Sequence, residues 1–270
     1  MQDERIAAHG LVLLGCGKMG SAMLAGWLER GLPADKVWVL DPGPSDWVVS
    51  TGVHVNAPLP DAPAVVLIAV KPQMMGNALP AITALANGQT VFISVAAGTP
   101  ISSFERAFGA NTPIIRAMPN TPSAVGRGIT ALCANVAGQS ALGEAELLMS
   151  AVGEVVCLES EAQMDAVTGV SGSGPAYVFH LIETLAAGGV AQGLPEELAL
   201  QLAKATVAGA GALAMQSDED PGQLRVNVTS PNGTTQAALE VLMDPDRGFP
   251  TLLPEAVAAA ANRSKELANG

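Results

Sequence analysis

The chain has 270 residues, of which 49% are hydrophobic and 14% charged, as expected of a globular protein with core enough for two domains. Its formal net charge of −12 argues against nucleic acid and anionic membrane as partners, because phosphate contacts need clustered Lys and Arg. Three cysteines without Cys-x-x-Cys spacing predict neither a disulfide framework nor a metal site, and they favour the cytoplasm.

Short apolar runs alternate with helical patterns over residues 1–159. Apolar strands separated by helices predict an α/β domain with a mostly parallel sheet, covered by helices on both faces. The predicted strands are 11–14, 37–40, 65–70, 91–95, 114–118, 129–133 and 155–158.

Beyond residue 159 the strand pattern stops, and residues 160–270 form a predicted all-helical domain. Its longest apolar stretch, 198–215, is interrupted by Gln201 and Lys204 and falls short of the ~20 residues of a membrane span. We expect a buried helix there, at a subunit interface. The predicted helices, several with Pro in the first turn, are 165–170, 175–192, 195–216, 234–243 and 253–268.

The first strand runs directly into the glycine motif Gly15–Gly20, and a helix follows to about residue 30. Glycine allows the tight turn there, and it lets the backbone approach a pyrophosphate at the helix start. Strand, glycines and helix in this order predict a dinucleotide-binding site, and Asp41 follows the second strand at the expected distance. The alternative is that the glycines only permit close packing of helix and strand.

Asp41 has two interpretations. A carboxylate at the end of this strand can accept hydrogen bonds from a ribose 2′-hydroxyl and would repel a 2′-phosphate, which favours NADH over NADPH. Alternatively, Asp41 is a turn residue that caps the strand before Pro42 and Gly43.

A second candidate site is the run Thr229–Thr235, directly before a predicted helix. Backbone N–H groups at a helix start, together with short hydroxyl side chains, can bind a carboxylate. Ordinary capping, with Ser230 as N-cap and Pro231 as first helical residue, needs fewer such residues than the run provides. The histidines His9, His54 and His180 fit no nucleophilic triad or metal site.

Taken together, the motifs resemble those of the pyrroline-5-carboxylate reductases, from about residue 11 to residue 267. The strongest match is Leu224–Thr235, where Asn232 replaces the usual glycine and should tolerate a left-handed backbone. The other landmarks, in the family's order, are Gly15–Gly20, Ala69–Pro72, Ser94–Gly98, Arg116–Pro122 and Ser171–Tyr177.

The resemblance implies a Rossmann domain followed by an all-α dimerisation domain, and a homodimer or larger homo-oligomer whose site lies between subunits. It also implies an NAD(P)H cofactor. The residues that would contact the cofactor are Leu14, Gly15, Cys16, Gly17, Lys18, Met19, Asp41, Asn56, Ala69, Val70, Lys71, Val95, Ala96 and Ala97.

For the substrate, the resemblance implies reduction of the C=N bond of 1-pyrroline-5-carboxylate to L-proline, the last step of proline biosynthesis. Thr235 would act as the catalytic residue by hydrogen-bonding the ring nitrogen. The residues that would bind the substrate are Glu161, Asn227, Ser230, Gly233, Thr234 and Thr235.

Three alternatives stay open on the sequence. A reductase of another cyclic imine would differ only in pocket walls that the sequence does not display. A β-hydroxyacid dehydrogenase-like enzyme would need an acid-base lysine, and Lys204 and Lys265 lie away from any glycine-rich helix start. A non-catalytic cofactor-binding protein should show damage in the second site, yet Ser230, Thr234 and Thr235 are all present.

Overall fold

The computed structural model describes residues 4–269, which form two compact units. Unit 1 contains the residues up to Gly172 and those from Ala260 onward, and unit 2 contains Ser173–Ala259. The division differs from the boundary expected after residue 159, because the segment 160–172 packs with unit 1, where Met164 is fully buried.

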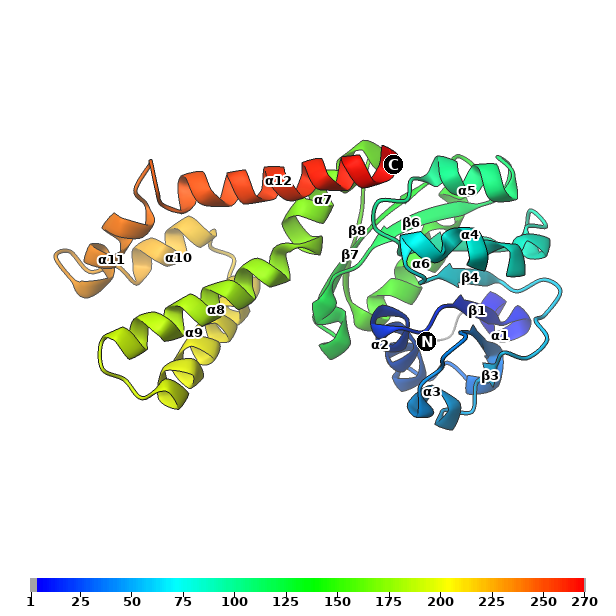
Figure 1. Cartoon of the computed structure of the whole chain (residues 1–270), viewed down its shortest axis with the longest axis horizontal. Coiled ribbons are helices and arrows are strands. Elements are labelled where there is room, and N and C mark those ends of the chain that lie inside the picture. The colour runs from blue at the N-terminus through cyan, green and yellow to red at the C-terminus, as the bar shows by residue number, and fades with distance from the viewer. Residues whose placement is uncertain (1–3, 270) are drawn as a thin grey trace. The chain divides into compact units, whose positions relative to one another are not determined.

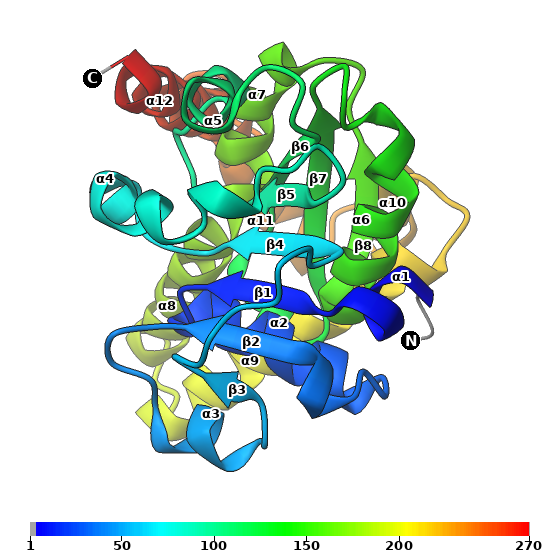
Figure 2. The same ribbon diagram turned by 90° about the vertical axis from the view of Figure 1, so that its right-hand side faces the viewer.

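Unit 1 is built on an eight-stranded sheet in the order β3-β2-β1-β4-β5-β6-β7-β8 (Figure 2). The first six strands are parallel, β7 runs antiparallel to β6, and β8 runs parallel to β7. The sheet is therefore mostly parallel, as predicted. The strands are β1 (Leu11–Leu14), β2 (Val37–Leu40), β3 (His54–Val55), β4 (Val65–Ile68), β5 (Val91–Ser94), β6 (Ile114–Met118), β7 (Gly128–Ala134) and β8 (Gly153–Cys157).

Helices cover both faces of this sheet, because successive strand residues point to opposite sides and both sides are apolar. In β1, Leu11 and Leu13 belong to one core cluster, and Val12 and Leu14 to the other. The first cluster includes residues of α1 (Glu4–His9), α2 (Lys18–Glu29), α3 (Asp46–Ser50) and α6 (Leu142–Met149). The second includes residues of α4 (Met75–Ala78), α5 (Ile101–Phe108) and α7 (Met164–Val167).

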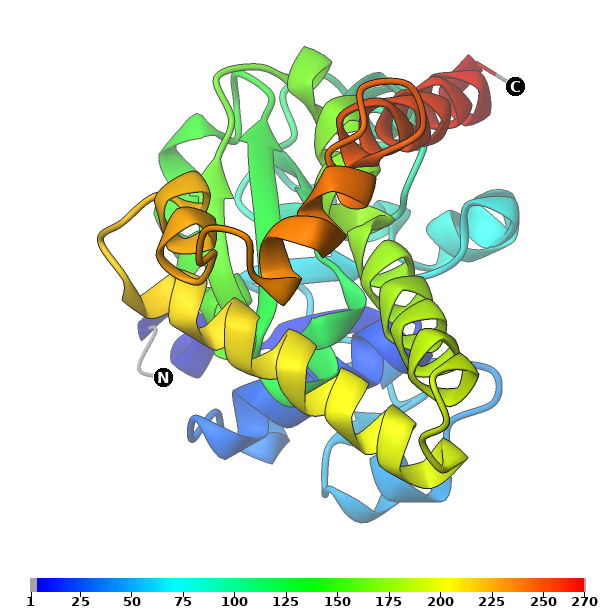
Figure 3. The ribbon, with the colours of Figure 1, turned by 90° about the vertical axis from the view of Figure 1, so that its left-hand side faces the viewer.

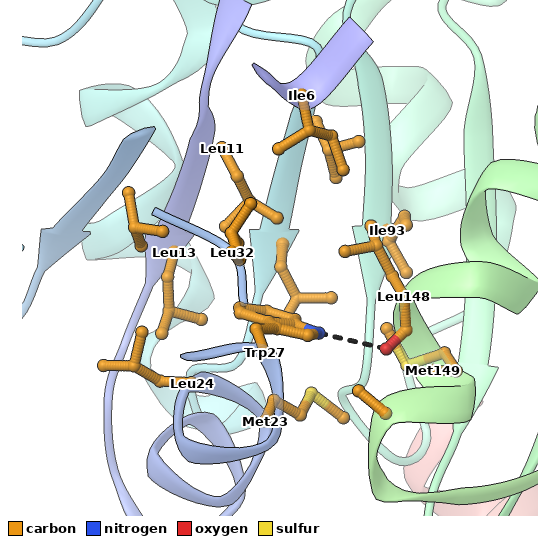
Figure 4. Close-up of a cluster of buried hydrophobic side chains, with 14 of the residues drawn as sticks. Ile6, Leu11, Leu13, Met23, Leu24, Trp27, Leu32, Ile93, Leu148 and Met149 are labelled. Atoms are coloured by element: carbon orange, nitrogen blue, oxygen red, sulfur yellow. Dashed lines mark hydrogen bonds between the residues drawn. The ribbon is translucent and has the colours of Figure 1, made fainter. Parts of the chain in front are cut away.

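Trp27 is the largest side chain of the first cluster and is fully buried (Figure 4). Its indole N–H donates to the backbone oxygen of Leu148 at 3.0 Å, which satisfies the polar atom that burial would otherwise leave without a partner. This bond ties α2, which follows the glycine motif, to the end of α6.

Unit 2 is helical, and its elements are α8 (Gly174–Ala191), α9 (Glu196–Gln216), α10 (Pro221–Asn227), α11 (Thr234–Leu242) and the first part of α12 (Phe249–Asn269). Helices α8 and α9 pack side by side (Figures 1 and 3). No helix was expected over 221–227, although Asp220 and Pro221 are start signals. The carboxylate of Asp220 accepts from the N–H groups of Gly222 and Gln223 and so caps α10.

Helix α9 is largely exposed within the single chain, so the burial of residues 198–215 at a subunit interface stays a prediction. Ala199 and Ala203 are buried, whereas Leu202, Leu213 and Met215 are 48%, 54% and 69% exposed. By length and composition alone α9 could cross a membrane, but core helices of soluble proteins pass the same test.

Candidate functional site

The predicted cofactor residues lie together at one edge of the sheet in unit 1. Strands β1 to β6 are parallel, so their carboxyl ends meet at this edge. The chain places β2 and β3 on one side of β1 and then crosses back to place β4 on the other side. Ligands of open α/β sheets bind at such a switch point. The segments that reach it are 14–19 after β1, Asp41 after β2, Asn56 after β3, 69–71 after β4 and 95–97 after β5.

The glycines of the motif Gly15–Gly20 have different roles. Gly15 has φ +87°, and a Cβ there would lie 3.0 Å from the backbone carbonyl of Ala69. Gly20 passes close to the backbone of Gly15, where a Cβ would lie 2.5 Å from its oxygen. Gly17, by contrast, has an ordinary φ of −68°, and a Cβ there would meet no described atom within 4 Å. The open space at Gly17 is what a bound pyrophosphate requires.

Gly17 is also the N-cap of α2, and no side chain caps the N–H groups of the first turn. Such groups have no acceptor within the helix and attract an anion. Within the loop, the hydroxyl of Ser21 donates to the backbone oxygen of Cys16 at 2.8 Å. The Ser21 bond thus stabilises the loop and leaves the N–H groups of the first turn of α2 without a side-chain acceptor.

The Asp41 carboxylate holds the same loop from the neighbouring strand. One oxygen accepts from the backbone N–H of Cys16 at 2.6 Å, and the other accepts from that of Gly43 at 2.8 Å. Asp41 therefore fixes the turn after β2, as the second interpretation expects, and also the glycine loop. Each carboxylate oxygen has two lone pairs, so these bonds leave capacity for a ribose hydroxyl.

Asn56 has a left-handed backbone, with φ +50°. Its side-chain oxygen accepts from the backbone N–H of Asp41 at 3.1 Å, and its amide nitrogen donates to the backbone oxygen of Asp41 at 2.8 Å. The side chain thus continues the pairing of β2 with β3 and positions Asp41, a role that the sequence did not suggest. Direct contact between Asn56 and the cofactor stays a prediction.

Cys16 lies inside the glycine loop with its thiol buried. Burial raises the pKa of this thiol, the hydrogen bond with Ser21 acts in the opposite direction, and the nearby Asp41 charge raises it further. The thiol is consequently protonated at neutral pH and places no negative charge beside a phosphate.

The predicted substrate residues of unit 2 lie at the end of α10, in the turn after it and at the start of α11. Asn232 adopts φ +58°, which confirms that asparagine tolerates the left-handed conformation there. Gly233 is the N-cap of α11, and no side chain caps this helix. Within residues 4–269 the hydroxyls of Ser230, Thr234 and Thr235 have no hydrogen-bond partner. Unengaged N–H groups and hydroxyls at a helix start suit a carboxylate ligand.

Asn227 and Glu161 are engaged by protein groups. The Asn227 amide donates to Glu219 at 2.8 Å and accepts from Gln223 at 2.8 Å, all within unit 2. Glu161 lies in unit 1, where one carboxylate oxygen accepts from Arg116 at 2.8 Å and from the N–H of Ile101 at 2.9 Å. These bonds give both residues a structural role, and their contact with substrate stays a prediction.

The described residues 4–269 contain no group of three or more His, Cys, Asp or Glu placed to hold a metal ion. His54 stacks on Trp38, and His180 is exposed beside Glu183.

Two sequence models of protein families match the chain. Residues 161–267 match the model for pyrroline-5-carboxylate reductase dimerisation. Residues 10–98 match the model described as NADP oxidoreductase coenzyme F420-dependent. The first match covers most of the helical part of the chain, and the second covers the glycine motif and the strands around it.

Comparison with individual proteins gives matches over almost the whole chain. The pyrroline-5-carboxylate reductase of Pseudomonas aeruginosa is 38% identical, with 99% of this chain and 98% of the relative covered. A pyrroline-5-carboxylate reductase structure from Coxiella burnetii is 33% identical, with a TM-score of 0.89, covering 96% of this chain and 98% of that one. The Plasmodium falciparum pyrroline carboxylate reductase structure, with NADP bound, is 28% identical with a TM-score of 0.82, at 96% and 98% coverage.

Proposed function

The chain belongs to the pyrroline-5-carboxylate reductase family and is an NAD(P)H-dependent oxidoreductase, and from this premise we propose how its residues carry the reaction. The reaction reduces the C=N bond of 1-pyrroline-5-carboxylate and yields L-proline. The observation that carries the assignment of sites is the pair of open helix starts, α2 at Gly17 and α11 at Gly233, each without a side-chain cap. The first suits a pyrophosphate and the second a carboxylate.

The dinucleotide binds at the carboxyl edge of β1 to β5 in unit 1. Gly17 and the first turn of α2 would hold its pyrophosphate, and the segments 69–71 and 95–97 would contact the other parts of the dinucleotide. The bound nicotinamide supplies the hydride. Asp41 favours NADH, because a carboxylate near the ribose repels a 2′-phosphate. The family match to an NADP oxidoreductase and the NADP-bound relative make NADPH the competing choice.

The turn between α10 and α11 binds the substrate. The N–H group of Thr234, with the hydroxyl of Ser230, holds the carboxylate. Gly233, whose own N–H donates to the backbone oxygen of Ser230 at 3.0 Å, shapes the turn. The Thr235 hydroxyl donates to the ring nitrogen and orients it. An imine nitrogen can already carry the proton, so the reaction needs no strong acid from the protein. The main contribution of these residues is orientation of two bound reactants, worth up to ~7–11 kcal/mol in well-aligned cases.

The functional assembly is a homodimer or larger homo-oligomer. Its support is the dimerisation model that matches residues 161–267 and the exposed apolar side chains of α8 and α9, among them Phe179 at 58% and Leu202 at 48%. Burial of such residues between two copies would remove them from water. In this assembly the turn between α10 and α11 faces a cofactor across the interface. The cytoplasm is the proposed location, since the cysteines are free and the chain is acidic.

The test is a reductase assay with 1-pyrroline-5-carboxylate, with NADH and NADPH in parallel, proline identified in the product, and a six-membered cyclic imine as the competing substrate. Oxidation of either cofactor with proline formed supports the proposal. Faster turnover of the six-membered ring would reassign the substrate. Binding of the cofactor without turnover would instead indicate a non-catalytic cofactor-binding protein.

A further inference from the structure

Asn120 lies at the carboxyl end of β6 and is only 9% exposed. Its side-chain oxygen accepts from the N–H of Ile129 at 3.0 Å, and its amide nitrogen donates to the backbone oxygen of Ser171 at 3.1 Å. One side chain thus joins the end of β6 to the start of β7 and to the last residues of unit 1 before the helical unit begins.

The Ser171 oxygen is available because of Pro175. In an α-helix this oxygen would accept from the N–H four residues later, and proline has none. The N–H of the next residue, Ala176, donates to the backbone oxygen of Ser173 at 3.0 Å and not to that of Ser171. The chain passes from α7 to α8 through a π-helical turn, Thr168–Gly172. The Ser171 carbonyl lacks the α-helical donor that residue 175 would supply, because Pro175 has no N–H. Asn120 supplies the missing donor.

The rest of this segment is also fixed to unit 1. Glu161, before α7, pairs with the buried Arg116 of β6 at 2.8 Å. Asp165, within α7, accepts from the buried hydroxyl of Ser264 of α12 at 2.6 Å. At Gly172 a Cβ would lie 2.7 Å from the methyl group of Met118, so the π-helical turn passes close to the end of β6. Unit 2 starts at the next residue, Ser173.

We propose that Asn120 is a positioning residue for hydride transfer, and that it acts by fixing the π-helical turn from which the substrate-binding unit leaves the cofactor-binding unit. The inference rests on the proposed division of labour, with the cofactor in unit 1 and Thr235 in unit 2. Because a misplacement of about 1 Å can cost on the order of 100-fold in rate, the start of α8 must be set accurately. π-Helical turns often occur at functional sites.

The first experiment compares Asn120→Asp with Asn135→Asp. Aspartate at 120 keeps an acceptor for Ile129 but places an oxygen against the Ser171 carbonyl. Asn135 is the control, since it is also a buried asparagine that accepts from the backbone N–H groups of Ile114 and Gly138. Its amide nitrogen donates to the backbone oxygen of Thr112 and to the carboxylate of Glu105. Both variants should lower the melting temperature. Only Asn120→Asp should lower kcat/KM, by about 10- to 100-fold, with cofactor Kd unchanged and faster hydrogen exchange over residues 168–176. Equal kcat/KM values for the two variants would overturn the proposal.

The second experiment restores the missing donor from the helix itself. Pro175→Ala provides an N–H for the Ser171 oxygen, so it should recover part of the kcat/KM lost in Asn120→Ala. A double-mutant cycle measures this coupling. Additive effects of the two substitutions would mean that Asn120 does not act through this carbonyl. Thr235→Ala is measured in parallel: wild-type turnover there would reject the proposed substrate site, whereas a loss there with no effect at Asn120 would reject the positioning role alone.

Discussion

The carboxylate of Asp41 accepts a hydrogen bond from the backbone N–H of Cys16 at 2.6 Å, so the residue proposed to select the cofactor also shapes the loop that holds its phosphates. The two functions can be separated by substitution, because asparagine keeps an acceptor oxygen and serine is too short to reach the loop in the same way.

Asp41→Ser should raise the ratio of NADPH to NADH use and weaken the binding of both cofactors, because the repulsive charge and the bond to Cys16 are lost together. Asp41→Asn should raise the ratio with a smaller loss of affinity, about threefold or less, because it can still accept from Cys16. Initial rates and fluorescence titrations with both cofactors measure this. An unchanged ratio in both variants would restrict Asp41 to its role in the turn.

Gly15→Ala should lower stability, whereas Gly17→Ala should weaken cofactor binding and leave stability unchanged. Alanine at 15 must adopt φ +87° and approach the Ala69 carbonyl, so we expect a loss of at least ~1–2 kcal/mol in the free energy of unfolding. Alanine at 17 meets nothing within 4 Å, so stability should be unchanged while cofactor Kd rises about tenfold or more. Urea unfolding and cofactor titration separate the two. Normal cofactor affinity in Gly17→Ala would place the pyrophosphate elsewhere.

Thr235→Ala should lower turnover by one to two orders of magnitude with little change in cofactor affinity, because its hydroxyl is proposed to orient the ring nitrogen. Thr251→Ala serves as the control, since that hydroxyl in the same unit already donates to the Pro245 oxygen at 2.5 Å. Steady-state kinetics of both variants decide the matter. Retention of wild-type turnover by Thr235→Ala would remove the residue from the mechanism.

Cys157 should react slowly with alkylating agents although it is exposed. Partial burial of the sulfur, a hydrogen bond to Glu146 and the charge of that carboxylate raise the pKa of this thiol to about 11. Only about one molecule in a thousand then carries the reactive thiolate at pH 8, and the rate should climb as pH approaches 11. Glu146→Gln removes the neighbouring charge, lowers the pKa and should speed labelling at pH 8. Equal labelling rates in the wild type and in Glu146→Gln would show that Glu146 does not raise the pKa of the Cys157 thiol.

Local patterns in the sequence predicted most elements of the fold. The apolar run 11–14 is β1, and the glycine motif behind it leads into α2, because strand burial and tight turns depend on neighbouring residues. The parallel arrangement of the first strands then placed Asp41 and the segments 69–71 and 95–97 at one edge. The two-residue strand β3 is too short to show a period, and the reversal of β7 and β8 depends on tertiary pairing.

Bonds between residues far apart in the chain were decided only by the tertiary structure. Asp41 and Cys16 are separated by 25 positions, Arg116 and Glu161 by 45, and Asn120 and Ser171 by 51. Cys16, Arg116, Asn120 and Ser171 lie in the landmark segments that resemble the family, and the resemblance implied Glu161 and Asn56 as ligand contacts. The sequence could not show that protein groups already engage them, because a hydrogen bond across such distances forms only after strand order and direction have brought the partners together.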